Sequence, residues 1–124
     1  MGYQICDHEH LYELQREAYE NSRAHGFWDS PMHLQNPIDC IPEKLCLIHS
    51  EVSEALEAFR EATGSLETYE SDTGKPEGFA SELADIAIRL LDLSEWLGLD
   101  LEKEIRRKMN YNKTRPFKHG SKRI

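Results

Sequence analysis

Residues 77–97 carry the strongest pattern in this chain, because apolar side chains cover much of the circumference when the segment is read as a helix. These side chains are Phe79, Leu83, Ile86, Ala87, Leu90, Leu91, Leu93 and Leu97. The remaining polar stripe is narrow and consists of Glu82, Asp85, Arg89 and Asp92. We therefore expect a helix packed on several sides, with the stripe facing either solvent or a polar site. Asp92 is expected to pair with Arg89 or to orient a ligand.

Three further helices are expected around this one. The predicted helices cover residues 8–25, 42–62, 77–97 and 101–112. Gly98 is placed to end the third helix and Asp100 to cap the start of the fourth. Residues 27–41 and 63–76 are rich in turn-forming residues and are expected to be loops. The sequence thus predicts an all-α fold with one domain over residues 1–124, whose tail, residues 113–124, is irregular and basic.

The composition is typical of a soluble helical domain. Hydrophobic residues make up 39% of the chain and charged residues 31%, which argues against disorder. The longest apolar run, Leu45 to Ile48, is far too short to span a membrane. The first thirty residues lack an apolar signal region, and the three cysteines lack Cys-x-x-Cys spacing, so we expect reduced thiols and a cytoplasmic location. A chain of 124 residues would bury more apolar surface by forming oligomers.

The charge is distributed unevenly along the chain. All 23 acidic residues and 7 basic residues fall within residues 1–105, whereas residues 106–124 hold 8 basic residues and no acidic one. A basic end of this kind can be simply solvated or can dock nucleic acid. It can also meet a polyanionic ligand that is held by the acidic body.

Two of the expected helices each carry a pair of carboxylates three residues apart, Glu51 with Glu54 and Glu82 with Asp85. Residues at this spacing lie on the same face of a helix. If the two helices pack antiparallel, four carboxylates can converge, and burying such unpaired charges is costly without a cation. Oxygen ligands of this kind suit a hard divalent ion such as Mg²⁺. The alternative is that both pairs lie on ordinary solvated helix faces.

Three segments of the chain closely resemble the MazG-like all-α nucleoside triphosphate pyrophosphatases. They are KLCLIHSEVSEALEAFR (44–60), GFASELADIAIRLLDLSEWLGLDL (78–101) and KMNYNKTRP (108–116). That superfamily also includes dimeric dUTPases, dCTP pyrophosphatases and phosphoribosyl-ATP pyrophosphohydrolases, and its mark is Glu-x-x-Glu followed by Glu-x-x-Asp. Here the two motifs are separated by 27 residues. The segment AHGFWD (24–29) is similar to the stretch that leads into the family's active-site loop.

The resemblance implies a four-helix MazG-like bundle that assembles as a dimer or a dimer of dimers. It implies that Glu51, Glu54, Glu82 and Asp85 bind two or three Mg²⁺ ions, with Mn²⁺ as a substitute. The implied reaction is hydrolysis of a nucleoside triphosphate between the α and β phosphates, in control of the nucleotide pool, with Glu54 and then Glu51 as catalytic carboxylates. A purine deoxynucleotide such as dGTP is the favoured substrate by family analogy.

The basic end has a role in this hypothesis. Lys108, Asn112 and Arg115 are spaced to meet the triphosphate, and Lys44 is a further phosphate candidate. Phe27 and Trp28 are candidates for stacking on a base, with packing in a core or an interface as the equal alternative.

A competing hypothesis is an acidic helical binding module whose basic tail docks nucleic acid or a partner protein, although nucleic acid is the less favoured partner. A di-iron carboxylate bundle is not supported, because neither Glu51 nor Glu82 is followed by His three residues later.

Overall fold

The computed structural model describes residues 10–30 and 36–116. Its helices are α1 (Leu11–Ala24), the 3₁₀ helix η1 (Pro37–Cys40), α3 (Ile41–Glu61), α4 (Phe79–Trp96) and α5 (Leu101–Lys113). Two short strands, β1 (Tyr69–Glu70) and β2 (Pro76–Glu77), lie between α3 and α4. The structure confirms the mostly helical fold, and each of the four α-helices matches a predicted one to within a few residues at its ends.

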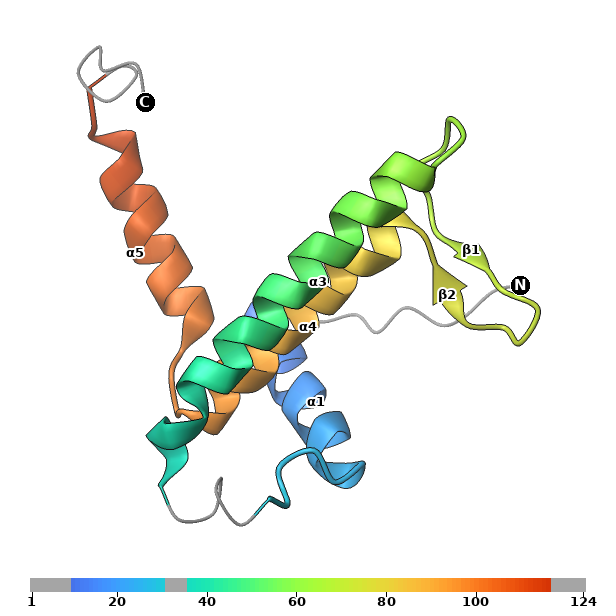
Figure 1. Ribbon diagram of the computed structural model, residues 1–124. Coiled ribbons are helices and arrows are strands. Elements are labelled where there is room, and N and C mark those ends of the chain that lie inside the picture. Colours follow the sequence, from blue (N-terminus) through green and yellow to red (C-terminus); the bar gives the residue numbers. More distant parts are fainter. Residues whose placement is uncertain (1–9, 31–35, 117–124) are drawn as a thin grey trace.

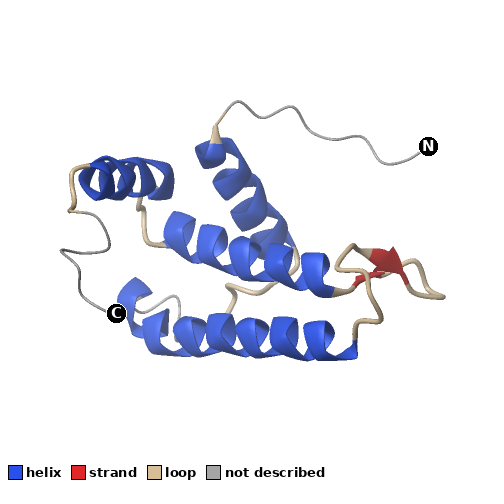
Figure 2. Cartoon of the chain, turned by 90° about the horizontal axis from the view of Figure 1, so that it is seen from above, coloured by secondary structure: helices blue, strands red, loops and turns tan. Residues whose placement is uncertain are grey.

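The strands β1 and β2 correct the prediction that residues 63–76 form only a loop. They pair antiparallel, with Tyr69 opposite Glu77 and Glu70 opposite Pro76. Strands of two residues are too short to show an alternating pattern, so sequence periodicity could not reveal them. The turn between them is closed by a hydrogen bond from the Gly74 amide to the Ser71 carbonyl, 2.8 Å long, and Gly74 has a φ of +81°. Figure 2 shows this hairpin at one end of the α3–α4 pair.

Helices α3 and α4 lie side by side and run antiparallel, and α1 packs against α4 (Figure 1). A small hydrophobic core lies at the end of the α3–α4 pair that is far from the hairpin. Its buried residues are Trp28, Cys40 and Leu93, with Tyr19, Ile48, Trp96 and Leu97 packed against them. The indoles of Trp28 and Trp96 stack with their ring centroids 4.3 Å apart. The core therefore joins the segment after α1 to η1, the first half of α3 and the last turns of α4.

The connection from α4 to α5 is fixed by the two caps that the sequence predicts. Gly98 has a φ of +70°, and the Leu99 amide donates to the Ser94 carbonyl over 2.9 Å, as in a Schellman motif. The Asp100 side chain accepts a 3.0 Å hydrogen bond from the Lys103 amide at the start of α5. Both predicted caps are thus present, and they set the direction in which α5 leaves α4.

Gln15 on α1 is 2% exposed and ties α1 to this connection. Its amide nitrogen Nε2 donates to Glu95 Oε1 over 2.9 Å and to the Leu99 carbonyl over 2.7 Å. Its oxygen Oε1 accepts from the Leu101 amide over 3.3 Å. One buried side chain therefore satisfies polar groups from the end of α4, the turn and the start of α5.

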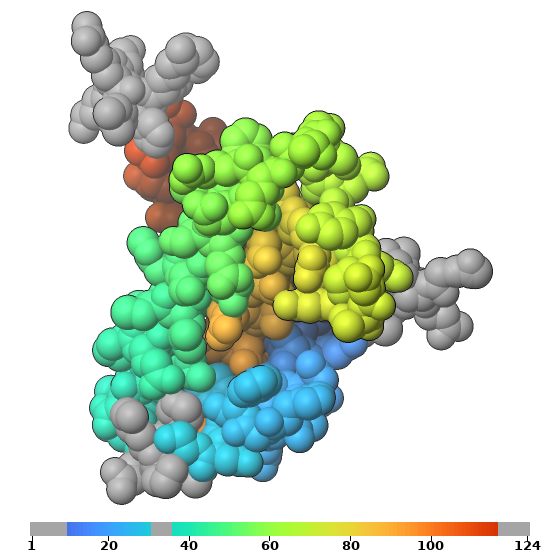
Figure 3. All heavy atoms as spheres, turned by 45° about the vertical axis from the view of Figure 1, so that its right-hand side comes forward, coloured from blue at the N-terminus to red at the C-terminus, as the bar shows by residue number. Residues whose placement is uncertain are grey.

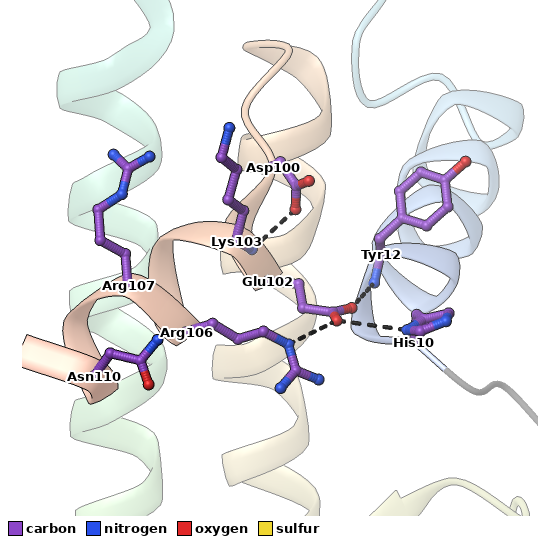
Figure 4. Close-up of a pocket in the computed structure, with 8 residues that line it drawn as sticks. All are labelled: His10, Tyr12, Asp100, Glu102, Lys103, Arg106, Arg107 and Asn110. Atoms are coloured by element: carbon purple, nitrogen blue, oxygen red, sulfur yellow. Dashed lines mark hydrogen bonds and ion pairs between the residues drawn. The ribbon is translucent and has the colours of Figure 1, made fainter. Parts of the chain in front are cut away.

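Glu102 holds the start of α5 against the start of α1, beside a hollow of about 580 Å³ (Figure 4). The Tyr12 amide donates to Glu102 Oε1 over 3.3 Å, and Arg106 Nε donates to Oε2 over 3.1 Å. His10 Nδ1 lies 3.5 Å from Oε2, and these contacts, led by the hydrogen bond from Arg106, lower the pKa of Glu102. Beyond this attachment α5 diverges from α3 and α4 (Figure 1).

The prediction that residues 77–97 pack on several sides is only partly fulfilled within one chain. Helix α4 contacts α3 and α1, yet Leu83, Ile88 and Leu90 remain 40–48% exposed. The outer face of α3 is also apolar and 48–57% exposed, at Leu45, Val52, Leu56 and Phe59. Of the helices described, none is both long enough and apolar enough to cross a bilayer.

Candidate functional site

Glu51, Glu82 and Asp85 form what we name the acidic cluster. Each supplies a carboxylate oxygen, and these three oxygens all lie within 4.8 Å of one another. Glu51 comes from α3, and the other two come from the first half of α4, where the antiparallel packing places them opposite it. The structure thus brings together three of the four carboxylates expected to converge. Glu54, one turn further along α3, is exposed and lies outside this group.

Glu82 has the most unfavourable environment of the cluster. Its Oε2 atom is buried and has no hydrogen-bond partner among the described residues. Burial raises the pKa of Glu82, and the nearby carboxylates of Asp85, Glu54 and Glu51 raise it further. An unsatisfied buried polar atom costs about 1–3 kcal/mol, so natural proteins rarely keep one without a reason. A cation that binds oxygen would relieve both the missing partner and the repulsion.

Arg89 brings a positive charge to the edge of the acidic cluster. Its Nε donates to Glu51 Oε1 over 2.9 Å, which links α4 to α3. The alternative that Asp92 pairs directly with Arg89 is not what the structure shows, because Asp92 Oδ1 instead accepts a 2.8 Å hydrogen bond from Trp28 Nε1. Arg89 reaches across to α3, whereas Asp92, nearly one turn further along α4, is bonded to the segment that follows α1.

Two hollows flank the acidic cluster, and both are lined in part by Glu51 and Asp85. The hairpin hollow, about 780 Å³, lies between the end of α3, the hairpin segment and the start of α4. The α1 hollow, about 500 Å³, lies between the end of α1, the first half of α3 and the middle of α4. In Figure 3, α4 (yellow to orange) lies recessed behind α3 on one side and behind the hairpin and the end of α1 on the other.

The two hollows differ in charge and in apolar surface. The carboxylates that line the hairpin hollow are Glu51, Glu54, Glu57, Glu61, Glu67, Glu77, Glu82 and Asp85. Lys75 is the one cationic side chain among the described residues of that lining. The α1 hollow instead has two cations, Lys44 and Arg89, opposite four carboxylates. Its apolar lining consists of Ala18, Phe27, Trp28, Leu47, Ile88 and Leu93.

Asp92 lies in the lining of the α1 hollow and is only partly exposed. Burial raises the pKa of its carboxyl group, while hydrogen bonds from Ser22 and Trp28 and the charges of Lys44 and Arg89 oppose the rise. The Lys44 ammonium lies 4.4 Å from the centroid of the Trp28 ring. A carboxylate and two cations therefore border the same hollow, next to the acidic cluster.

Of the two aromatic residues considered for base stacking, Trp28 is packed in the core. It is 2% exposed, with Trp96 stacked against it and Lys44 over its ring, which is the packing alternative that the sequence left open. Phe27 is 65% exposed and lines the α1 hollow, so its ring is available to a ligand.

The predicted phosphate-binding residues separate into two groups. Lys44 lines the α1 hollow, next to the acidic cluster. Lys108 and Asn112 lie on α5 and Arg115 just beyond it, and within the described chain none of the three lines either hollow. The charged groups of Lys108 and Arg115 each lie 5.9 Å from the centroid of the Tyr111 ring. Because α5 diverges from α3 and α4, these residues do not meet the acidic cluster within one chain (Figure 1).

The sequence indicated the importance of the polar stripe on α4 without assigning Arg89 to Glu51 or Asp92 to a hollow. Both residues belong to the same narrow stripe as Glu82 and Asp85, and that membership was the available signal. The scan against protein-family models, the search of curated proteins and the search of solved structures each found no match to this chain.

Proposed function

We propose that this chain is a Mg²⁺-dependent nucleoside triphosphate pyrophosphohydrolase, which releases a nucleoside monophosphate and pyrophosphate. The observation that carries the proposal is the buried and unpartnered Oε2 of Glu82 at the point where carboxylates from α3 and α4 converge. The order of the motifs, Glu-x-x-Glu and then Glu-x-x-Asp, and the resemblance to MazG-like enzymes support the same conclusion.

The acidic cluster fits a hard divalent cation, because its donor atoms are all carboxylate oxygens. Glu51, Glu82 and Asp85 would hold Mg²⁺, or Mn²⁺ in its place, with Glu54 at the edge to complete a site for two or three ions. When bound, such ions neutralise the polyphosphate and lower the pKa of a bound water. The positive charge of the ions would then compensate the repulsion between Glu82 and the neighbouring carboxylates.

Glu54 is the carboxylate best placed to act as general base. It is exposed and lies outside the closest group, yet its charge reaches Glu82. It takes the proton of a water molecule as the water oxygen bonds to the α-phosphorus, and Glu51 is the second catalytic carboxylate. The bond from the α-phosphorus to the bridging oxygen breaks, and pyrophosphate leaves with the electron pair. Lys44, at the neighbouring hollow, supplies positive charge to the phosphates.

A complete site would require a second copy of the chain. Lys108, Asn112 and Arg115 can contact the substrate phosphates only if α5 of one protomer reaches the acidic cluster of another, because α5 diverges from that cluster in its own chain. The exposed apolar faces of α3 and α4 support such an assembly, since exposed patches of this kind mark interaction surfaces. The assembly would be a homodimer or a dimer of dimers.

The substrate would be a deoxynucleoside triphosphate, with a purine such as dGTP favoured. Pyrophosphate release should be measured over all NTPs and dNTPs, with Mg²⁺ and then with Mn²⁺. Glu54→Ala and Glu82→Gln should abolish release, whereas Glu20→Gln, an exposed carboxylate on α1, should leave it unchanged. Full activity in Glu82→Gln, or no release from any nucleotide, would refute the proposal.

The alternative function is an acidic helical module that docks nucleic acid or a partner protein. It is favoured by one observation, namely that α5 carries exposed basic residues at Arg106, Arg107 and Lys108 away from α3 and α4. Binding of DNA or RNA that weakens steeply with salt, in a protein that releases no pyrophosphate, would support this alternative.

A further inference from the structure

We propose that the α1 hollow is the nucleoside subsite, and that Asp92 accepts hydrogen bonds there from a base with two adjacent N–H groups, as in guanine. The inference rests on the proposed function for the phosphate end of the substrate, because the hollow shares Glu51 and Asp85 with the site of the reaction.

The size and surface of the α1 hollow suit a nucleoside. Its volume of about 500 Å³ falls inside the range of roughly 300–1,000 Å³ that is usual for small-molecule sites. Leu47, Ile88 and Leu93 supply apolar walls, and the exposed ring of Phe27 offers a face on which a base can stack. Base faces are apolar while base edges are polar, so such a site needs only a few polar groups.

The charges of the two hollows decide which one receives the nucleoside end. The hairpin hollow places eight carboxylates against Lys75, so without cations it repels an anionic ligand along most of its lining. The α1 hollow has two cations, Arg89 bonded to Glu51 of the acidic cluster, where the α-phosphate of a bound nucleotide would lie, and Lys44 over the Trp28 ring. A nucleotide that enters with its phosphates at the acidic cluster is therefore better accommodated with its base in the α1 hollow.

Asp92 provides the polar group that reads the base. Its Oδ1 is held by the 2.8 Å hydrogen bond from Trp28 Nε1, and Ser22 gives it a further hydrogen bond. A carboxylate has about four acceptor positions, so these contacts fix its orientation and leave acceptor capacity for a ligand. Two oxygens side by side match the ring N–H and the amino group of guanine. Adenine and cytosine offer an amino group beside a ring acceptor, which a carboxylate would repel.

The test compares dGTP with dITP, because hypoxanthine lacks only the 2-amino group of guanine. The full-length wild-type chain should show a kcat/KM for dGTP at least roughly tenfold above that for dITP, as expected for a hydrogen bond to a charged group. In Asp92→Asn the Trp28 bond can persist, since an amide oxygen still accepts, but one acceptor becomes a donor. The dGTP to dITP ratio should then fall to about one.

The matched control is Glu67→Gln, which removes a carboxylate from the lining of the hairpin hollow. This variant should keep the wild-type ratio. Inorganic tripolyphosphate, which has no nucleoside, should inhibit wild type and Asp92→Asn equally, which shows that the phosphate end and the fold are intact. An unchanged ratio in Asp92→Asn, or a ratio altered by Glu67→Gln, would overturn the nucleoside assignment.

A binding measurement keeps this inference separate from the proposed function. If no triphosphate is hydrolysed, the proposed function fails, yet calorimetric titration with dGMP and dIMP still tests the hollow. Tighter binding of dGMP than of dIMP, lost in Asp92→Asn, supports the subsite. Absence of dGMP binding, or equal binding of both nucleotides by wild type, refutes it.

Discussion

Gln15 on α1 and Glu82 on α4 both carry buried polar atoms, and they differ in what surrounds those atoms. The Gln15 amide makes three hydrogen bonds, to Glu95, Leu99 and Leu101, at the junction of α1, α4 and α5. Glu82 Oε2 has no such partner in the described structure, and its side chain lies beside the carboxylates of Glu51 and Asp85. A buried network that is fully satisfied stabilises the fold, whereas an unsatisfied charge destabilises it. The first region stabilises the fold, and the second is where we propose that a ligand binds.

The largest expected effect is on activity at the acidic cluster. Glu82→Gln should lower kcat/KM for pyrophosphate release by at least roughly 100-fold, since changes even to groups behind metal ligands cost up to that factor. The same variant should unfold no more easily than wild type without Mg²⁺, because it removes the repelled charge. Activity and urea unfolding measured on one preparation test both statements. If Glu82→Gln loses activity because it is unfolded, then Glu82 is needed for the fold. Glu82 would then not differ from Gln15 in its role.

The second effect is the response to Mg²⁺. At about 100 times its dissociation constant, Mg²⁺ should add about 2.7 kcal/mol to the free energy of unfolding of wild type. Gln15→Ala should gain the same increment, because its change is remote from the acidic cluster, whereas Glu82→Gln should gain much less. Thermal unfolding with and without Mg²⁺ measures the increments. Equal gains in all three proteins would show that the ion binds elsewhere.

Replacing Gln15, whose polar atoms all have hydrogen-bond partners, should lower the free energy of unfolding and have little other effect. Gln15→Ala leaves the Leu99 carbonyl and the Leu101 amide without their partner, and we expect a loss of about 2 kcal/mol in the free energy of unfolding. Glu20→Ala, an exposed change on the same helix, should alter stability by less than about 0.5 kcal/mol. Urea denaturation followed by tryptophan fluorescence measures both. A loss no larger than that of Glu20→Ala would mean that the α1 junction is not needed for the fold.

The two regions also differ in how far the sequence could predict them. The carboxylate pairs that place Glu51, Glu82 and Asp85 are local i, i+3 patterns, so their presence on facing helices could be anticipated. The role of Gln15 could not, because it depends on a turn more than eighty residues away in sequence. The contact of Arg89 with Glu51 depends on the rotation of α4 against α3, which periodicity does not specify.

Two further features, the direction of α5 and the burial of Trp28, could not be predicted from local sequence patterns for similar reasons. The divergence of α5 follows from the geometry of the Gly98–Asp100 connection and from contacts with α1, although both caps were predicted individually. The burial of Trp28 requires Trp96, at the far end of α4, to lie against it. Local patterns thus predicted the helices and three of the carboxylates that converge, whereas the directions of the elements depended on contacts between distant residues.

The smallest expected effect is a pH-dependent contribution of Glu82 to stability, which Gln15 cannot make because its amide does not titrate. The folded chain binds the Glu82 proton more tightly than the unfolded chain does, because its pKa is raised above the ordinary value of 4.5 by burial and by the neighbouring carboxylates. Without Mg²⁺, this group should therefore lower the free energy of unfolding as pH rises from 4.5 through the raised pKa, with no further change above it. The glutamine in Glu82→Gln does not titrate, so the stability difference between the variant and wild type should grow over that window.

The comparison between these two proteins isolates Glu82 from the other shifted groups. Asp92 has a raised pKa and contributes with the same sign, and Glu102 has a lowered pKa and contributes with the opposite sign, but both are present in wild type and in Glu82→Gln. Gln15→Ala should keep the contribution of Glu82, because the change is remote from the acidic cluster. Saturating Mg²⁺ should remove the growth of the difference, since a cation stabilises the ionised carboxylate. A difference that stays constant from pH 4.5 to about pH 8 would place Glu82 in water and remove the reason for assigning it a ligand.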